Sequence, residues 1–142
     1  MNTNALSYDD VLLTPQYSDI KSRSEIDISV TLGNGLELSL PIIASPMDTI
    51  SETQMAAAMA DAGACAVIHR YNTIEEQARL VGAARDKCQN GIIGGAVGVQ
   101  GDFLNRASVL RALGVDFICV DVAHGHHILM KEALRTLRNA LG

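Results

Sequence analysis

Four short apolar runs in this chain each end in a cluster of polar or small residues, and a helix-like segment follows each one. The runs are residues 40–44, 64–68, 92–97 and 115–120, and the clusters begin at Ser45, His69, Gly98 and Asp121. Continuous apolar runs of this length are typical of strands that are buried on both faces of a parallel sheet. Parallel strands place their carboxyl ends at one edge, where α/β folds bind ligands. The four clusters therefore predict a binding site at that edge.

The segments between the runs carry helix signals. Ser51 with Gln54 and Thr73 with Glu76 fit capping boxes, and Asp102 is placed to cap a third helix. Apolar residues then recur at helical spacing. They are Met55, Ala56, Met59 and Ala60, then Ile74, Ala78 and Val81, then Phe103, Ala107, Leu110 and Leu113, and finally Met130, Leu134, Leu137 and Leu141. The order is β-α repeated four times, with strands starting near residues 41, 64, 92 and 115.

Two architectures fit this order. One is an open doubly wound sheet, and the other is the first half of a (β/α)₈ barrel, whose units average about 30 residues. A doubly wound phosphate-binding domain usually has a glycine-rich turn after its first strand. The first turn here, residues 45–49, contains no glycine, which favours the barrel, but the pattern alone leaves both open.

Residues 1–40 do not follow this β-α repeat. We expect residues 7–17 to form an irregular segment that packs its apolar side chains on the body. Ile26, Ile28 and Val30 alternate with polar residues, residues 33–35 have turn chemistry, and leucines alternate from Leu36 onward. This pattern predicts a β-hairpin. The expected organisation is a single partial domain, 1–142, with a segment and hairpin over 1–40 and a half-barrel over 41–142.

Composition excludes several classes of protein. The chain is 48% hydrophobic and 19% charged, which is typical of a globular protein. Its net charge of -5 argues against nucleic acid as a partner. No apolar stretch approaches the roughly 20 residues that cross a membrane. The amino terminus shows no basic region followed by an apolar stretch, the pattern of a signal peptide. Together with unpaired cysteines, this predicts a cytoplasmic protein.

The first two clusters offer possible substrate contacts. Ser45 and Asp48 could orient the edge of a ring or a sugar, and Met47 could lie against a flat heteroaromatic ring. Local evidence favours the plainer interpretation, in which Pro46 forms a turn and Met47 fills the core. Arg70 could contact a phosphate or a carbonyl group. A surface arginine, and a hydrogen-bonded role for His69, are equally compatible with the sequence.

The last two clusters offer possible cofactor contacts. Gly98 and Gln100 lie where a cofactor could approach the main chain, although the glycines of 91–98 do not match the dinucleotide fingerprint and more often permit close packing. Asp121 could hold a ribose diol, with helix capping as its alternative. His124 is close by. The spacing of the three histidines at 124, 126 and 127 fits no helical zinc motif, so we expect no metal site. None of the three cysteines looks like a nucleophile: only Cys88 could have the exposed, electropositive setting that a thiolate needs, and it would lie on the wrong side of the sheet.

At these residues the chain resembles the IMP dehydrogenase/GMP reductase family. The matching segments are residues 6–13, 44–49, 68–70, 96–99 and 121–126, and they occur in family order. The resemblance implies a (β/α)₈ barrel of TIM type, of which this chain is the first half. It implies oxidation or reduction of a purine nucleotide with a nicotinamide cofactor, NAD for a dehydrogenase or NADP for a reductase. It also implies a homotetramer.

The resemblance assigns roles to six residues. Ser45 and Met47 would contact the purine nucleotide, with Arg70 facing the same site, while Asp121 would hold the nicotinamide ribose. Gln100 and His124 would lie near the cofactor. The family's catalytic cysteine and its glycine-rich phosphate cradle belong to the second half of the barrel. We therefore expect no catalytic residue in this chain and no turnover by it alone.

Three functions follow as alternatives. The connection at residues 85–91 lacks the regulatory insert usual in dehydrogenases, residues 45–48 look more like a dehydrogenase, and residues 21–25 look more like a reductase. IMP oxidation to XMP with NAD is the first expectation, and GMP reduction to IMP with NADPH is the second. The third is a non-catalytic module. A half-barrel has two open sheet edges, so each version predicts self-association or pairing with a second half-barrel.

Overall fold

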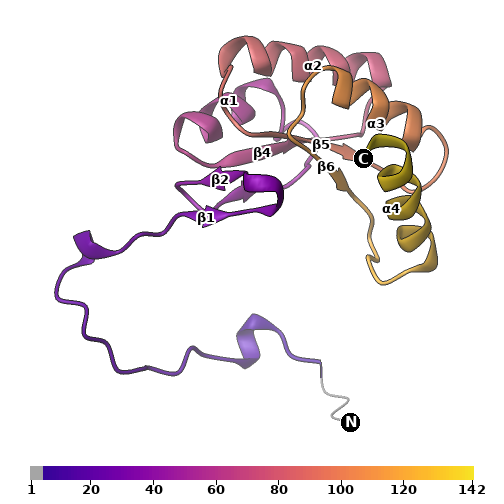
Figure 1. Ribbon diagram of the computed structural model, residues 1–142. Coiled ribbons are helices and arrows are strands. Elements are labelled where there is room, and N and C mark those ends of the chain that lie inside the picture. The colour runs from indigo at the N-terminus through magenta and orange to yellow at the C-terminus, as the bar shows by residue number, and fades with distance from the viewer. Residues whose placement is uncertain (1–4) are drawn as a thin grey trace.

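The computed structural model describes residues 5–142, and its body is a four-stranded parallel sheet with helices packed on one face (Figure 1). The strands run in the order β3, β4, β5, β6. Their bounds are Ile43–Ala44, Cys65–Ile68, Ile93–Val97 and Phe117–Val120. The helices are α1 (Thr53–Asp61), α2 (Ile74–Lys87), α3 (Phe103–Ala112) and α4 (Ile128–Leu141). The four predicted β-α units are confirmed. The first four residues, on which the expectation about a leader depends, lie outside the described part.

The core lies between the sheet and helices α1 to α3. Every residue of β4 and β5 is buried, as the continuous apolar runs predicted. Strand glycines permit close packing here, since a Cβ on Gly94 would lie 2.5 Å from the Phe117 ring and one on Gly95 2.9 Å from Leu110. This confirms the packing interpretation of these glycines.

Gln77 on α2 fixes the ends of two strands within this core. Its side chain is fully buried, and its Nε2 donates hydrogen bonds to the carbonyl oxygens of Ile68 at 3.2 Å and Ala96 at 2.9 Å. Its Oε1 accepts one from Arg106 Nη1 at 2.8 Å. Buried polar groups stabilise a fold only when they are paired, and this set holds the tips of β4 and β5 in register.

The predicted helix caps are only partly correct. Thr73 caps α2, because its hydroxyl accepts the Glu76 N–H at 3.1 Å. The Ser51–Gln54 box is wrong: α1 begins at Thr53, and Ser51 Oγ donates instead to the Ser45 carbonyl. Asp102 occupies the N-cap of α3 but makes no side-chain cap, since Arg106 binds its carboxylate at 2.9 Å. In both cases a tertiary or ionic partner competes for the capping group.

The predicted hairpin is present but short. It pairs β1 (Val30–Thr31) with β2 (Glu37–Leu38) across the turn η3 (Gly33–Gly35). The Leu40 N–H donates to the Gly63 carbonyl at 2.9 Å, so the chain leaving the hairpin contacts the amino-terminal end of β4. A hollow of about 290 Å³ between them is lined by residues of the hairpin and of the strand starts. The hairpin thus lies at the edge opposite the predicted site.

Residues 5–29 extend away from the body (Figure 1). They contain two single 3₁₀ turns, η1 (Tyr8–Asp10) and η2 (Arg23–Glu25), and no strand. The expectation that residues 7–17 pack on the body is wrong, because Leu12 and Leu13 are 96% and 99% exposed. The alternation from Ile26 likewise produces a strand only at Val30. Of the helices in the described residues, none has the length and apolar character needed to span a membrane.

Candidate functional site

All six predicted site residues lie in loops at the carboxyl edge of the sheet. Ser45 and Met47 follow β3, and Arg70 follows β4 by two positions. Gln100 belongs to the loop after β5, while Asp121 and His124 follow β6. Since the four strands are parallel and adjacent, the loops share one edge. The shared location agrees with the sequence argument, whereas the ligand roles of these residues stay predictions.

Arg70 and Asp121 are in direct contact across the edge. Arg70 Nε lies 3.2 Å from Asp121 Oδ2, and Nε and Nη2 donate to the Asp121 carbonyl oxygen at 3.2 and 2.9 Å. Both side chains are partly buried, which reduces solvent screening of the ion pair. Because the two residues follow β4 and β6, which lie on either side of β5, the arginine side chain passes over the end of β5.

Gly98 lies beside this passage. A Cβ at Gly98 would lie 3.4 Å from Arg70 Nη1, which is ordinary van der Waals contact, so the guanidinium lies directly against this glycine. Tyr71 supports the pair from outside: the Arg70 guanidinium carbon lies 5.3 Å from the centre of its ring, and its hydroxyl lies 3.4 Å from Asp121 Oδ2. The second carboxylate oxygen of Asp121, Oδ1, accepts no hydrogen bond from the described residues. The arrangement therefore fixes Asp121 while leaving one acceptor for a ligand.

The β3–α1 loop presents a different surface. Met47 is 52% exposed, which contradicts the interpretation of Met47 as core filler. Ser45 is also exposed, and no described residue is hydrogen-bonded to its hydroxyl. Its carbonyl accepts the N–H of Met47 at 2.9 Å and the hydroxyl of Ser51. The loop thus offers a thioether and a free hydroxyl side by side, which suits a flat heteroaromatic ligand with polar edges.

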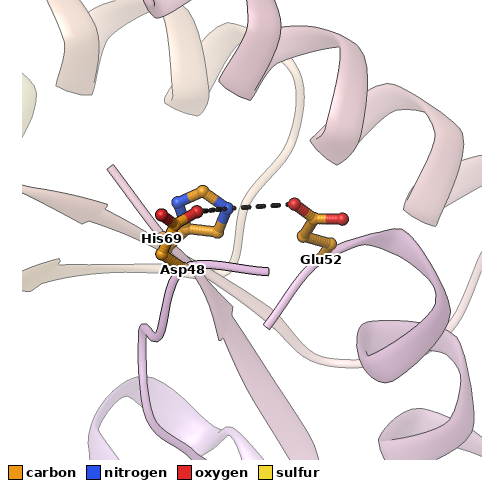
Figure 2. A group of neighbouring side chains, drawn as sticks. All are labelled: Asp48, Glu52 and His69. Carbon is orange, nitrogen blue, oxygen red and sulfur yellow. Dashed lines mark hydrogen bonds and ion pairs between the residues drawn. The ribbon is translucent and has the colours of Figure 1, made fainter. Parts of the chain in front are cut away.

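The same loop takes part in a cluster that sequence reasoning missed. His69 is 2% exposed, and its Nε2 lies 3.3 Å from Glu52 Oε1 and 3.8 Å from Asp48 Oδ1 (Figure 2). From the sequence, His69 could be either a functional residue or a simple hydrogen-bonded histidine. No spacing rule connects positions 48, 52 and 69, because a strand and a helix separate them. The one available signal was a histidine directly after a buried strand.

Gln100 and His124 are both exposed. The His124 ring lies edge-on to His127, with 6.3 Å between the ring centres. His127 caps α4, since its Nδ1 accepts the Leu129 N–H at 3.1 Å. A small, mainly apolar hollow of about 200 Å³ lies beside them, lined by residues such as Val99, Val122 and Met130. A larger hollow of about 560 Å³ follows the exposed side of α4 and its preceding loop, away from Arg70 and Asp121.

The three cysteines are inert by position. Burial raises the pKa of the Cys65, Cys88 and Cys119 thiols above the ordinary value of 9.0. Asp116 and Asp121 add to this increase at Cys65 and Cys119 respectively. Cys88, the one thiol that might have been exposed, is 7% exposed and donates to the Ala84 carbonyl at 3.0 Å. Since the thiolate is the nucleophile, none of the three is poised for attack.

Comparison with known proteins identifies a family whose members resemble this chain. A family model described as the IMP dehydrogenase / GMP reductase domain matches residues 5–142. The chain is 49% identical over 76 residues to inosine-5'-monophosphate dehydrogenase of Nitrosopumilus maritimus, and 45% identical over 76 residues to GMP reductase of Leishmania donovani. Each match covers 54% of this chain, but 16% and 15% of those proteins. The matched parts are therefore a small share of either relative.

Among solved structures, the chain is similar to the crystal structure of inosine 5' monophosphate dehydrogenase from Legionella pneumophila. The TM-score is 0.83 and the identity 41%, over 98% of this chain and 42% of that one. The predicted fold class, a parallel α/β sheet of TIM-barrel type preceded by a hairpin, is confirmed by this likeness, with this chain covering part of the barrel. The choice between an open sheet and a barrel, which the repeat pattern left open, is thereby decided.

Proposed function

Because this chain belongs to the IMP dehydrogenase/GMP reductase family, we propose that its carboxyl-edge loops form part of a site that oxidises IMP to XMP with NAD. The observation that carries the proposal is the constellation at this edge. An exposed thioether and hydroxyl follow β3, and a fixed carboxylate with a free oxygen follows β6. These groups suit a purine and a ribose, the two parts that a nucleotide oxidoreductase must hold close together.

In this proposal Met47 lies against the purine and Ser45 binds its polar edge or its sugar. Arg70 uses the donors of Nη1, which Asp121 leaves free, to face the same ligand. Asp121 accepts from the nicotinamide ribose through Oδ1, and Gln100 and His124 line the cofactor side. The nicotinamide ring supplies the hydride acceptor when it is bound. The residues of this chain bind and orient the two partners.

The 142 residues are proposed to bind without turning over. Their cysteines are buried or partly buried and have raised thiol pKa values, which supports the view that none supplies the nucleophile. Turnover then requires the other half of the barrel, which would pair with the strands at the open edges, β3 and β6. In the cell the protein is proposed to be cytoplasmic and to assemble with copies of itself.

GMP reduction to IMP with NADPH is the second candidate, favoured by the 45% identity to the Leishmania reductase. A non-catalytic module that pairs with an intact family barrel is the third, favoured by the open sheet edges. Titrating the chain with IMP, GMP, NAD and NADPH, alone and joined with the complementary half of a family barrel, separates the three. Absorbance of the reduced nicotinamide reports turnover and its direction. Binding to an intact barrel without turnover would select the module.

The cofactor role of Asp121 has a matched control at the opposite end of β6. Asp116 is also partly buried and paired with an arginine, Arg85, but lies at the amino edge. We expect Asp121→Asn to weaken cofactor binding by about 10-fold to 100-fold, the worth of a hydrogen bond to a charged group. Asp116→Asn should leave cofactor affinity unchanged. Equal affinities in both variants would remove Asp121 from the site.

A further inference from the structure

The β3–α1 loop, residues 45–52, depends on β4 for its shape. It contains no helix or strand, and Thr49 adopts a φ of 60° within it. The His69 N–H donates to the Ser51 carbonyl at 3.3 Å, and the Ser51 hydroxyl in turn donates to the Ser45 carbonyl. The residue directly after β4 therefore contacts the loop through its main chain.

The His69 side chain adds a second attachment. Its ring is buried between the two carboxylates of the loop, with Nε2 facing both Asp48 and Glu52 (Figure 2). Asp48 lies next to Met47, and Glu52 is the last residue before α1. One imidazole nitrogen is thus in reach of the middle and the end of the loop that presents Ser45 and Met47.

The protonation of the ring distinguishes a clamp from a metal site. Asp48, Glu52 and His69 place three possible ligand atoms within 4.8 Å of one another. However, the Tyr71 N–H donates to His69 Nδ1 at 3.2 Å, so the lone pair of Nδ1 is already engaged. The ring proton must then be on Nε2, the nitrogen that faces the carboxylates. A metal ion would need a lone pair at that position.

We propose that His69 is a positioning residue, whose Nε2–H holds the loop 45–52 in the conformation that presents Ser45 and Met47 to the nucleotide. The identity of that nucleotide rests on the proposed function, but the clamp does not. Because the ring is buried at the end of β4, its hydrogen bond to Glu52 ties the more exposed loop to the sheet. His69 therefore acts on the ligand through the loop and makes no contact of its own.

Two substitutions test the roles of the two ring nitrogens separately. His69→Gln puts an amide donor near the position of Nε2 and keeps a hydrogen bond to Glu52. His69→Asn keeps an acceptor near the position of Nδ1 for Tyr71 but cannot reach the carboxylates. Glu52→Ala removes the acceptor without touching the ring, and it removes no helix cap, since Glu52 makes none. This third variant keeps the test decisive if a His69 variant fails to fold.

The first measurement is amide hydrogen exchange on the full chain. The Met47, Ile50 and Ser51 amides are hydrogen-bonded within the loop and report its opening. We expect exchange at these amides to be about 10-fold faster or more in His69→Asn and Glu52→Ala, and close to the parent rate in His69→Gln. Amides of α2 and α3 should not change. Unchanged loop exchange in His69→Asn and Glu52→Ala, or faster exchange throughout, would overturn the clamp.

The second measurement is IMP affinity, which should weaken about 10-fold in His69→Asn and recover in His69→Gln. If the parent chain does not bind IMP, the proposed function fails while the exchange result still decides the clamp.

The third measurement is titration with Co²⁺, followed by visible absorbance. We expect no tetrahedral cobalt spectrum, and a spectrum that disappears in His69→Asn would replace the clamp with a metal site.

Discussion

Leu13 and Leu110 are leucines in two regions that differ in secondary structure and in burial. Leu13 is 99% exposed in the amino-terminal segment, residues 5–29, and Leu110 is fully buried between α3 and β5. The segment has apolar residues but no repeating unit, so they form no common face. From β3 onward, many apolar residues belong to strands or helices whose period directs them toward the sheet, and these form the core. Apolar content alone does not bury a side chain.

The difference also concerns polar groups. In the amino-terminal segment the polar contacts are local, such as Ser7 with Asp10 and Asp27 with Ser29, and backbone N–H donors lower the pKa of these two aspartates. In the body they join distant parts of the chain, as Arg70 with Asp121. The polar contacts of the amino-terminal segment therefore stabilise local turns, whereas those of the body hold distant parts of the chain together.

The largest expected effect comes from shortening one leucine in each region. Leu110→Ala should lower the free energy of unfolding by about 2–5 kcal/mol, because it leaves a cavity against β5. Leu13→Ala should change it by less than about 0.5 kcal/mol. Urea unfolding followed by circular dichroism measures both. A comparable loss in Leu13→Ala would mean that the segment packs on a surface in solution, and the contrast between the regions would fail.

A smaller effect is expected where the hairpin joins the body. Gly63 has a φ of 76°, and a Cβ there would lie 1.9 Å from Ser39 Oγ. Gly101 has a similar φ of 65° with no atom within 4 Å of such a Cβ. Gly101→Ala should destabilise by about 1–2 kcal/mol through backbone strain alone. Gly63→Ala should cost up to about 1 kcal/mol more, since the Ser39 hydroxyl must turn away from Gly63. Equal losses in thermal or urea unfolding would show that the hairpin is loosely attached.

The smallest effect tests two helix caps of the same kind. Thr73 accepts the Glu76 N–H at the start of α2, and Ser22 accepts the Ser24 N–H at the turn η2. Thr73→Ala should lower stability by about 1 kcal/mol, because α2 packs on the sheet and its cap is coupled to global unfolding. Ser22→Ala should have no measurable effect on the same transition. Any loss in Ser22→Ala would indicate that η2 contributes to the cooperative unit.

Much of the fold could be predicted because its signals are local. Strand starts expected near residues 41, 64, 92 and 115 are found at Ile43, Cys65, Ile93 and Phe117. Buried strands follow from short continuous apolar runs and amphipathic helices from a period of 3.6 residues, and both can be recognised within a short window. The position of Ser45, Met47, Arg70, Gln100, Asp121 and His124 at one edge followed from the β-α order, since parallel strands end on the same side.

Contacts between these loops could not be predicted, because they depend on strand register and on the space between loops. Arg70 reaches Asp121, 51 positions away, because the sheet order places their loops on either side of the end of β5. The Asp48, Glu52 and His69 cluster needs the loop 45–52 folded against β4. The Ser51 hydroxyl binds the Ser45 carbonyl in place of its predicted capping role, and Asp102 binds Arg106, which lies one helical turn away. By itself the sequence determined the strands and helices and the sheet edge at which the loops meet. The tertiary structure decided which polar groups are in contact at that edge. Such contacts join residues far apart in the chain, so their distances cannot be deduced from sequence spacing.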